Sequence, residues 1–300
     1  MTPLVSVVLP TLNRADTLQH VLPTITGQDC RPGSVEILVC DGGSTDETAD
    51  IVAEIDAPNV RLLADAGASR AAARNTGIRA AQGTFVLFTD ADILADPGLL
   101  RAHMAAHARH PGSAIVGREI QVSSLNDVSS VRGGLRRLHS LHPSWRRRLS
   151  WMFFLTGNAS VRRSDLLRVG LFDESFAAYG HEDLELGYRL QQAGVRIRYD
   201  AAAVNYHWHP VDHVERLRKM ESAGAATVRM FRKHRDPRIL LGLGVNPITL
   251  GLHMLVGVCP PARRVLTDLA PRSAAVRAIA RQEAYLTGVA RAWSGREPGR

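Results

Sequence analysis

The first third of the chain alternates short apolar runs with segments of helical periodicity. The apolar runs are rich in Val, Leu, Ile and Phe and predict β-strands, and the segments between them open on Asp or Ser, which cap helix N-termini. The predicted strands are residues 5–9, 35–39, 60–63 and 85–88, and the predicted helices are residues 16–26, 46–55 and 69–81. This strand–helix–strand order predicts an α/β fold built on a parallel sheet with right-handed crossovers.

The regular alternation ends after a further predicted helix at residues 96–110 and a strand at residues 114–117. Residues 118–150 are polar and rich in arginine, and a second organised block follows them. Helical patterns resume near residue 212 and enclose an apolar run at residues 239–258 that has no formal charge. We therefore divide the chain into three parts, residues 1–117, 118–211 and 212–300, and predict that the last is helical.

The composition narrows the class of protein. Of the 300 residues, 45% are hydrophobic and 22% are charged, which excludes a disordered chain. The three cysteines lie far apart without CxxC spacing, so a disulfide framework and a zinc ribbon are excluded and a reducing compartment fits best. The N-terminal residues lack the basic region of a secretory signal, and a cytoplasmic location is expected.

The net charge of +8 comes from 37 Lys and Arg against 29 Asp and Glu. This balance favours anionic partners such as phosphates, nucleic acid or an acidic membrane. The sequence has no helix-turn-helix, RNP or zinc motif, so we do not expect nucleic acid as a partner.

Polar segments follow three of the predicted strands. In parallel sheets, ligands bind beyond the carboxyl ends of the strands, so these segments should meet at one rim. They are residues 10–14, 41–44 and 90–92. The segment at 41–48 joins a strand to a helix, where backbone N–H groups favour an anion. An alternative is that its glycines only make a turn, with Ser44 or Thr45 capping the helix.

The Asp90-Ala91-Asp92 segment places two carboxylates at the end of an apolar strand. Such a pair suits Mg²⁺ or Mn²⁺, which prefer oxygen ligands and bridge to a diphosphate. Between the second and third rim segments, Arg70 and Arg74 lie four residues apart on one face of a predicted helix. They either face a nucleotide's phosphates or form a solvated face.

Taken in order, five motifs resemble the family 2 glycosyltransferases of GT-A fold. The motifs are PTLNR, CDGGSTDET, ASRAAARNTGIRAAQG, VLFTDAD and FDESFAAYGHEDLELGYRLQQAG, within residues 4–210. The resemblance implies a Rossmann-like, mixed and mainly parallel sheet flanked by helices, here with a C-terminal helical extension. It also implies inverting, metal-dependent sugar transfer from a nucleoside diphosphate sugar, with UDP as the commonest carrier.

The resemblance assigns roles to individual residues. Nucleotide binding falls to Thr11, Asn13, Arg14, Asp41, Arg74, Asn75 and Asp90. The metal, Mn²⁺ or Mg²⁺, falls to Asp90 and Asp92 together with His207 or His209, between which the extended segment leaves the choice open. Asn158 and His181 are candidate contacts to the donor sugar or the acceptor.

Glu182 and Asp183 resemble the family's acidic motif, in which the Asp acts as the base. Inverting transfer needs a carboxylate within hydrogen-bond reach of the acceptor hydroxyl, and Asp183 is the candidate. An alternative is that both acids stabilise the first turn of a helix that ends at Gly194, and the two roles are compatible.

The expected partners are a donor sugar nucleotide and an acceptor hydroxyl on a glycan, a lipid-linked glycan or a small molecule. Two regions are candidates for peripheral contact with the inner face of the cell membrane, the arginine- and aromatic-rich residues 132–154 and the apolar run at 239–258. For the first of them, a basic acceptor-binding segment is the alternative. The second is about the minimum length for a membrane span, and a segment that is buried or lies in the plane of the membrane is preferred to a true span. The alternative function is a scaffold or regulator that binds the sugar nucleotide without chemistry.

Overall fold

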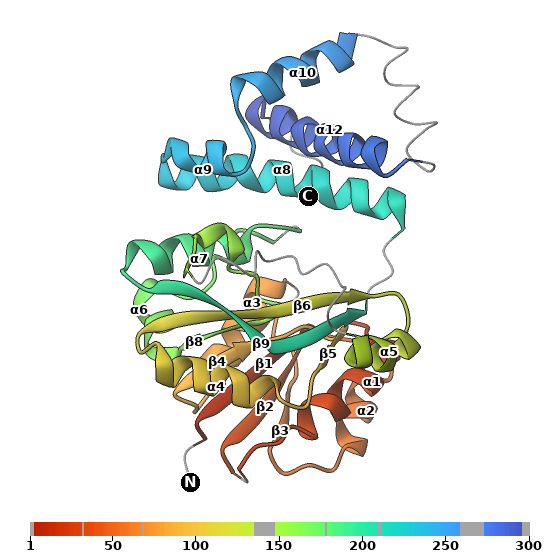
Figure 1. The fold of residues 1–300 in the computed structure, drawn as a ribbon, viewed down its shortest axis with the longest axis vertical. Coiled ribbons are helices and arrows are strands. Elements are labelled where there is room, and N and C mark those ends of the chain that lie inside the picture. The colour runs from red at the N-terminus through yellow and green to blue at the C-terminus, as the bar shows by residue number, and fades with distance from the viewer. Residues whose placement is uncertain are drawn as a thin grey trace. The chain divides into compact units, whose positions relative to one another are not determined.

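The computed structural model describes residues 3–31, 33–67, 69–134, 148–177, 179–208, 212–258 and 273–295. The chain forms two compact units (Figure 1). The first, here called the sheet domain, comprises Met1–Ala177 and Glu182–Pro210, and the second, the helical unit, comprises Ala178–His181 and Val211–Arg300. The expected helical extension from residue 212 lies within the second unit.

A nine-stranded sheet forms the centre of the sheet domain, in the order β3-β2-β1-β4-β8-β6-β9-β5 with β7 paired to β9. The strands are β1 Val5–Thr11, β2 Val35–Asp41, β3 Val60–Leu63, β4 Phe85–Phe88, β5 Ile93–Ala95, β6 Ser113–Val122, β7 Arg148–Leu149, β8 Ala159–Arg162 and β9 Arg196–Trp208. The first four strands are mutually parallel, as predicted, whereas β8 runs antiparallel to both β4 and β6. The boundary expected after residue 117 falls inside β6, so the first two parts of the chain share one sheet.

Helices flank this sheet, which confirms the α/β fold class (Figure 1). They are α1 Ala15–Thr26, α2 Thr48–Glu54, α3 Arg70–Ala80, α4 Leu99–Arg109, α5 Leu125–Gly134, α6 Arg163–Val169 and α7 Glu182–Gln192. β1 is buried along its whole length, which explains its mainly apolar sequence. Gly77 lets α3 lie close to the sheet, because a Cβ there would be 2.6 Å from Val8 Cγ1 and 2.7 Å from Cys40 Sγ.

The aromatic end of the predicted membrane-contacting region 132–154 belongs to the core. Trp151 and Phe154 are buried, and Trp151 packs edge-to-face against Tyr188 of α7. These aromatic rings are therefore not available to an interface, and that part of the prediction is wrong. Residues 135–147, which hold four of the arginines of this region, lie outside the described residues.

The helical unit contains α8 His213–His234, α9 Pro237–Gly242, α10 Pro247–Val258 and α12 Ala274–Trp293. The apolar run at 239–258 is divided into α9 and α10 by Gly244, at φ +78°, and by Asn246, whose Oδ1 accepts hydrogen bonds from the first backbone N–H groups of α10. Among the helices in the described part of the chain, none combines the length and hydropathy needed to cross a bilayer.

Small residues let α8 and α12 cross in close contact. A Cβ at Gly224 would lie 2.0 Å from Tyr285 O, and one at Gly288 would lie 1.9 Å from Glu221 O. The contacts run from Gly224 and Tyr285 to the stacked rings of Phe231 and Trp293. Near its start α8 places Arg216 within electrostatic range of Arg281, and near its end Arg232 donates to Ala292 O, so α8 and α12 are parallel.

Candidate active site

The ends of β1 and β2 are tied together by their loops. Thr11 and Asp41 are paired in register as the last residues of these strands, and both are buried. The Asn13 backbone N–H donates to Ser44 Oγ at 2.8 Å, and Asn13 Oδ1 accepts a hydrogen bond of 2.8 Å from the Thr45 N–H. These contacts bring three of the predicted nucleotide-binding residues to one rim of the sheet, and Thr11 Oγ1 is buried there with no hydrogen-bond partner among the described residues.

The alternative in which Ser44 or Thr45 caps the following helix is wrong. α2 begins at Thr48, and the Asp46 carboxylate accepts its backbone N–H at 3.2 Å. Ser44 instead bonds to Asp41, whose carboxylate accepts its hydroxyl at 2.5 Å and its N–H at 3.1 Å. The loop is thus built on Asp41 itself, which supports that carboxylate at the tip of β2.

Arg74 joins the two acidic motifs. Its side chain is only 2% exposed, and its guanidinium donates to Asp90 Oδ1 at 2.7 Å and to Glu182 Oε1 at 3.2 Å. Arg70 Nε lies 3.4 Å from the same Glu182 oxygen. The arginines on one face of α3 therefore bind carboxylates, and they hold the acids after β4 close to those that begin α7.

Asp183 differs electrostatically from its neighbour. Glu182 is desolvated, which acts to raise its pKa, but Arg70 and Arg74 lower that pKa below its usual value. Burial, together with the negative charge of Glu182, raises the pKa of Asp183 to about 7. The pair thus consists of one firmly ionised carboxylate and one that exchanges a proton near neutral pH, which is what a general base requires.

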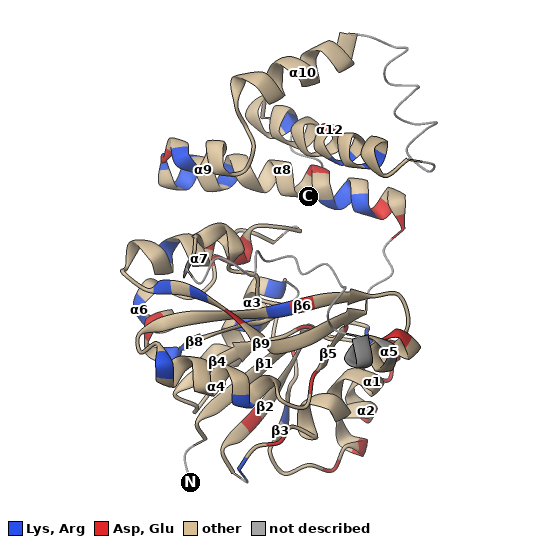
Figure 2. Cartoon of the chain, viewed as in Figure 1, with Lys and Arg blue, Asp and Glu red and all other residues tan. Residues whose placement is uncertain are grey.

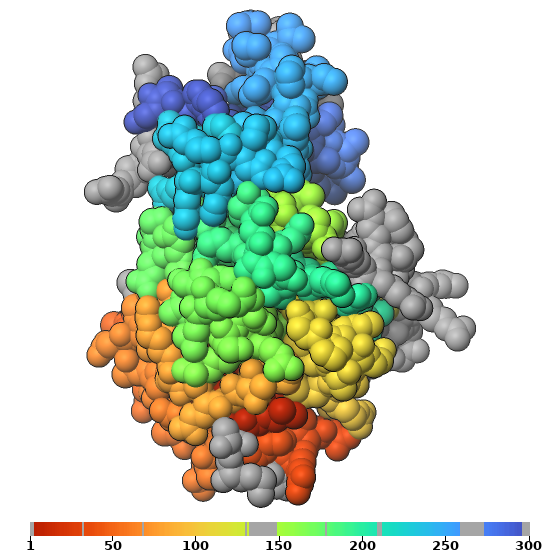
Figure 3. Space-filling model, turned by 90° about the vertical axis from the view of Figure 1, so that its left-hand side faces the viewer, coloured from red at the N-terminus to blue at the C-terminus, as the bar shows by residue number. Residues whose placement is uncertain are grey.

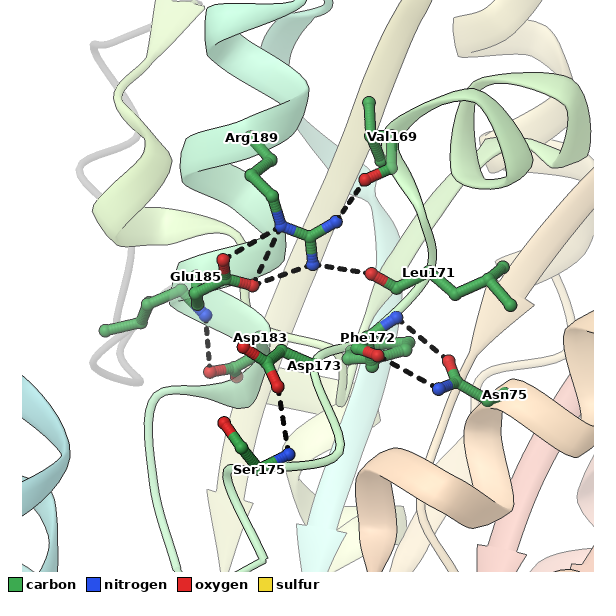
Figure 4. A network of polar contacts seen from close by, with 10 residues as sticks. Asn75, Val169, Leu171, Phe172, Asp173, Ser175, Asp183, Glu185 and Arg189 are labelled. Atoms are coloured by element: carbon green, nitrogen blue, oxygen red, sulfur yellow. Dashed lines mark hydrogen bonds and ion pairs between the residues drawn. The ribbon is translucent and has the colours of Figure 1, made fainter. Parts of the chain in front are cut away.

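A buried ion pair anchors the helix that carries these acids. Figure 4 shows Arg189 reaching Glu185 one turn earlier on α7 and the carbonyl oxygens of Val169 and Leu171. Asp183 is half-buried at the first turn of α7, where its Oδ1 accepts the Leu184 N–H at 2.8 Å. α7 begins at Glu182 and the chain turns at Gly194, so the predicted stabilisation of the first helical turn is compatible with a role for Asp183 in chemistry.

His207 lies between two carboxylates. Its Nε2 is 3.6 Å from Asp92 Oδ2, and its Nδ1 is 3.2 Å from Glu119 Oε1. Desolvation acts to lower the pKa of His207, but hydrogen bonds to Asp92 and Glu119 raise it to about 10. The pairing of β5 with β9 explains the arrangement, since Ile93 lies opposite His207 and the Trp208 N–H donates to Asp92 O at 2.9 Å.

The donor set of Asp92 and His207 fits Mg²⁺ or Mn²⁺ bound together with a diphosphate. The described residues contain no group of three or more His, Cys, Asp or Glu side chains arranged to hold an ion. Magnesium sites commonly use one or two protein ligands and complete the shell with phosphate oxygens and water, and an octahedral ion with bonds of ~2.1 Å places adjacent ligands about 3 Å apart. The separation of 3.6 Å between Asp92 and His207 needs only a small adjustment to meet this value.

Glu119 is the residue of this site that the sequence analysis missed. It is paired with Asn205 in register, and Gln121 is paired with His207, so the four side chains share one face of the sheet. Gly157 leaves room for Glu119, because a Cβ there would lie 2.5 Å from Glu119 Oε2. The sequence signal for Glu119 was a polar residue at every second position, Glu119 and Gln121, directly after the strand that we expected to end at residue 117.

Asn75 and Asn158 occupy buried networks and not the rim of the site. Asn75 donates to Phe172 O and accepts the Phe172 N–H (Figure 4). It also donates to Glu174 Oε1. Asn158 donates to Ala203 O at 3.0 Å, and its Oδ1 lies 2.8 Å from His103 Nε2. Because their amide groups are engaged, we assign both residues to supporting the fold and leave them out of the proposed ligand-binding set.

The remaining predicted residues lie in other settings. Arg14 is half-buried at the N-cap of α1. His181 belongs to the helical unit, where its Nε2 is 2.7 Å from Thr227 Oγ1, which in turn is 2.7 Å from Tyr285 Oη. His209 lies outside the described residues.

Sequence comparison identifies two matching protein families. The profile described as glycosyl transferase family 2 matches residues 6–170, and the profile described as N-terminal domain of galactosyltransferase matches residues 136–218. Among curated proteins, validoxylamine A glucosyltransferase of Streptomyces hygroscopicus subsp. limoneus is 34% identical over 230 residues, which cover 64% of this chain and 49% of the relative. The chain thus spans about half the length of that relative.

Solved structures give the same fold. The mannosyltransferase PcManGT of Pyrobaculum calidifontis, in complex with GDP-Man and Mn²⁺, superposes with a TM-score of 0.65 at 22% identity, covering 99% of this chain and 89% of that one. S. aureus TarS 1-349 in complex with UDP-GlcNAc gives a TM-score of 0.56 at 18% identity over 99% and 93% of the two chains. These likenesses confirm the GT-A fold. Since the first profile covers more than half of the sequence, the chain belongs to glycosyl transferase family 2.

Proposed function

We propose that this protein is an inverting glycosyltransferase that moves a sugar from a nucleoside diphosphate sugar to an acceptor hydroxyl. The observation that carries the proposal is the link through Arg74, which holds Asp90 and Glu182 in one assembly beside Asp183. The solved relatives in complex with GDP-Man, UDP-GlcNAc and UDP support a sugar nucleotide as donor, with UDP as our first choice. The free cysteines Cys30 and Cys40 support a cytoplasmic setting.

The proposed reaction assigns separate tasks to the residues of the site. Asp183 removes the proton of the acceptor hydroxyl while that oxygen bonds to the anomeric carbon of the donor sugar. The bond from this carbon to the diphosphate oxygen breaks on the opposite face, so the configuration inverts and the electron pair leaves with the diphosphate. Thr11, Asn13 and Asp41 line the rim at which the nucleoside would bind.

Asp92 and His207 would hold the divalent cation, with Asp90 beside them. The cation would supply electrostatic stabilisation of the diphosphate as it leaves. The pKa of His207 near 10 means that its ring carries a proton which cation binding must displace, so binding should release protons. Glu119 would accept the remaining Nδ1–H and orient Nε2 toward the cation.

We expect binding of UDP, the test of the donor site, to depend on Mn²⁺ and on the two Asp residues after β4. In calorimetric titrations, Asp92→Ala should weaken Mn²⁺-dependent UDP binding by at least about 100-fold, because removing a ligand costs more than removing a residue that orients one. Asp90→Ala combined with Asp92→Ala should abolish it. The matched control is Asp50→Ala, an exposed acid on α2, which should leave binding unchanged.

Two further outcomes of these titrations and one of a transfer assay matter. Binding of GDP or of thymidine diphosphate in preference to UDP would change the nucleotide and leave the site in place. Tight binding that needs neither Mn²⁺ nor the Asp pair would contradict the proposed donor site. Donor binding without sugar transfer to any acceptor in a broad panel would favour the alternative of an inactive scaffold.

Replacing Glu119 with Gln is expected to weaken Mn²⁺ binding in the presence of UDP by about 10- to 100-fold, the usual cost of losing a group that orients a metal-binding His. The measurement is the electron paramagnetic resonance signal of free Mn²⁺, which does not depend on turnover. Glu54→Gln, at an exposed position of α2, is the control with the same charge change. If Glu119→Gln binds Mn²⁺ with unaltered affinity, Glu119 does not support the proposed metal site.

A further inference from the structure

The net positive charge of the protein comes from the helical unit. Residues 211–300 hold 16 of the 37 Lys and Arg but only 7 of the 29 Asp and Glu, which gives this segment a net charge of +9 and the rest of the chain −1. Figure 2 shows the basic residues along α8, α9 and α12, whereas α10 has none. An excess of this size on one unit creates a field that attracts anionic surfaces.

The outward face of α10 is apolar. Five of its large side chains are exposed, and the outermost, Ile248 and Val258, have exposed fractions of 75% and 79%. The five are Ile248, Leu252, Met254, Leu255 and Val258. The light-blue segment that contains α10 lies at the surface of this unit in Figure 3. A surface helix normally turns its polar face to solvent, so α10 has the opposite polarity.

The other face of α10 is already occupied within the unit. His253 Nδ1 lies 2.8 Å from Glu283 Oε2 of α12, and Leu250 packs against the cluster of Tyr285 and Leu286. These two contacts fix the rotation of α10 about its own axis relative to α12. The exposed apolar side chains of α10 therefore face away from α12.

A group of arginines lies where α8 and α12 approach. Arg281 of α12 lies within electrostatic range of Arg216 of α8 and of Arg277, which is one turn earlier on α12. Burial, and then the charges of Arg216 and Arg277, lower the pKa of Arg281. Arg281 Nε is buried and has no hydrogen-bond partner in the part of the chain that the structure describes. Clustered guanidinium groups of this kind are stabilised by phosphate or another anion.

We propose that the helical unit docks on the surface of an anionic phospholipid bilayer, with the outer face of α10 among the lipid head groups and the unit's basic residues near the lipid phosphates. A nucleic acid would explain the net charge of +9 but not the exposed aliphatic side chains. An apolar protein partner would explain the aliphatic side chains but not the charge. Only a bilayer interface offers both apolar depth and negative charge. With 12 residues, α10 is about 18 Å long, which suits a helix lying in the plane of the interface.

This proposal goes beyond the sugar transfer and is tested without it. The full chain is mixed with vesicles of phosphatidylcholine alone or with 30% phosphatidylglycerol, and bound protein is measured by flotation. We expect at least about 10-fold tighter binding to the anionic vesicles, and weaker binding as NaCl rises from 0.1 to 0.5 M.

Two double variants separate the contributions. Leu252→Ser with Leu255→Ser should reduce vesicle binding by about 10-fold or more, and so should Arg277→Gln with Arg281→Gln. The matched controls lie in the sheet domain: Leu167→Ser, an exposed leucine of α6, and Arg61→Gln with Arg101→Gln, which make the same charge change. Circular dichroism verifies that each variant keeps its helix content.

Three results would overturn the proposal. They are the absence of binding to anionic vesicles, equal binding to both kinds of vesicle, and binding that the leucine variant leaves unchanged. A wild-type dimer that does not bind vesicles, and that the leucine variant converts to monomer, would identify a second copy as the partner of α10. The same measurements report nothing on turnover, so they can fail or succeed independently of the proposed transferase activity.

Discussion

Changing Asp183 to Asn is expected to lower the rate of sugar transfer by about 10²- to 10⁴-fold, the contribution of a general base, while UDP and Mn²⁺ bind as before. The amide keeps the size of the side chain but cannot accept the acceptor's proton. The measurements are kcat in a saturated transfer assay and calorimetric binding of UDP. Asp183 lies on α7, whereas the proposed cation ligands lie after β4 and on β9, so chemistry and donor binding should separate.

The matched control for Asp183→Asn is Asp165→Asn. Asp165 is an acid in the first turn of α6 that forms an ion pair with the exposed Arg168, an interaction that contributes little to stability. That variant should transfer sugar at the normal rate. Full turnover by Asp183→Asn would eliminate the residue as the base, and loss of UDP binding together with turnover would make its role structural.

The pH dependence gives the same assignment a second test. Because the pKa of Asp183 is raised to about 7, the carboxyl is protonated and inactive below that pH, so kcat/KM should fall about tenfold per pH unit on the acid side. Glu182→Gln removes the negative charge that helps to raise this pKa, and the acid limb should therefore move to lower pH. If the acid limb of the kcat/KM profile does not move, the pKa of another group determines its position.

The strand ends were predictable because they depend on local sequence. The apolar runs that became β1, β2 and β4 are buried strands, and the parallel-sheet rule then placed Thr11, Asp41 and Asp90 at their carboxyl ends. The start of α7 at Glu182 followed from its acidic first turn. Each of these inferences uses residues that are close together in the chain.

The contacts that complete the site join residues far apart in the sequence. Glu119 meets His207 across 88 positions, and Asn158 meets His103 across 55, so no local pattern identifies either partner. Asn158 followed the family motif in sequence, yet its amide is used inside the sheet domain, where burial lowers the pKa of His103 to about 4 and leaves a neutral ring to share hydrogen bonds. A motif therefore predicts which residues matter more reliably than it predicts what they contact.

Arg74 also bridges distant segments, 108 positions to Glu182, and its replacement should have the largest effect on stability. Arg74→Met leaves Asp90 and Glu182 without their shared counter-charge in a mostly buried setting, which is expected to cost about 3–5 kcal/mol of unfolding free energy. For a domain of this size, that corresponds to a fall of roughly 10 °C in Tm. The measurement is urea and thermal unfolding of the full chain.

The pH dependence of this loss distinguishes the electrostatic cause from lost packing. Arg74 helps to lower the pKa of Glu182, so without Arg74 that pKa rises. Protonation of Glu182 at low pH then relieves the uncompensated charge, so the destabilisation should be larger at pH 8 than at pH 5. Arg79→Met is the control on the same helix. Arg79 is exposed, and its ion pair with Glu174 is long, at 3.8 Å, so this variant should lower the unfolding free energy by less than about 1 kcal/mol. Adding Glu182→Gln to Arg74→Met should restore part of the stability. A loss that is equal at both pH values and unrelieved by Glu182→Gln would show that Arg74 acts by filling space, and the link between the acids after β4 and those on α7 would then need another basis.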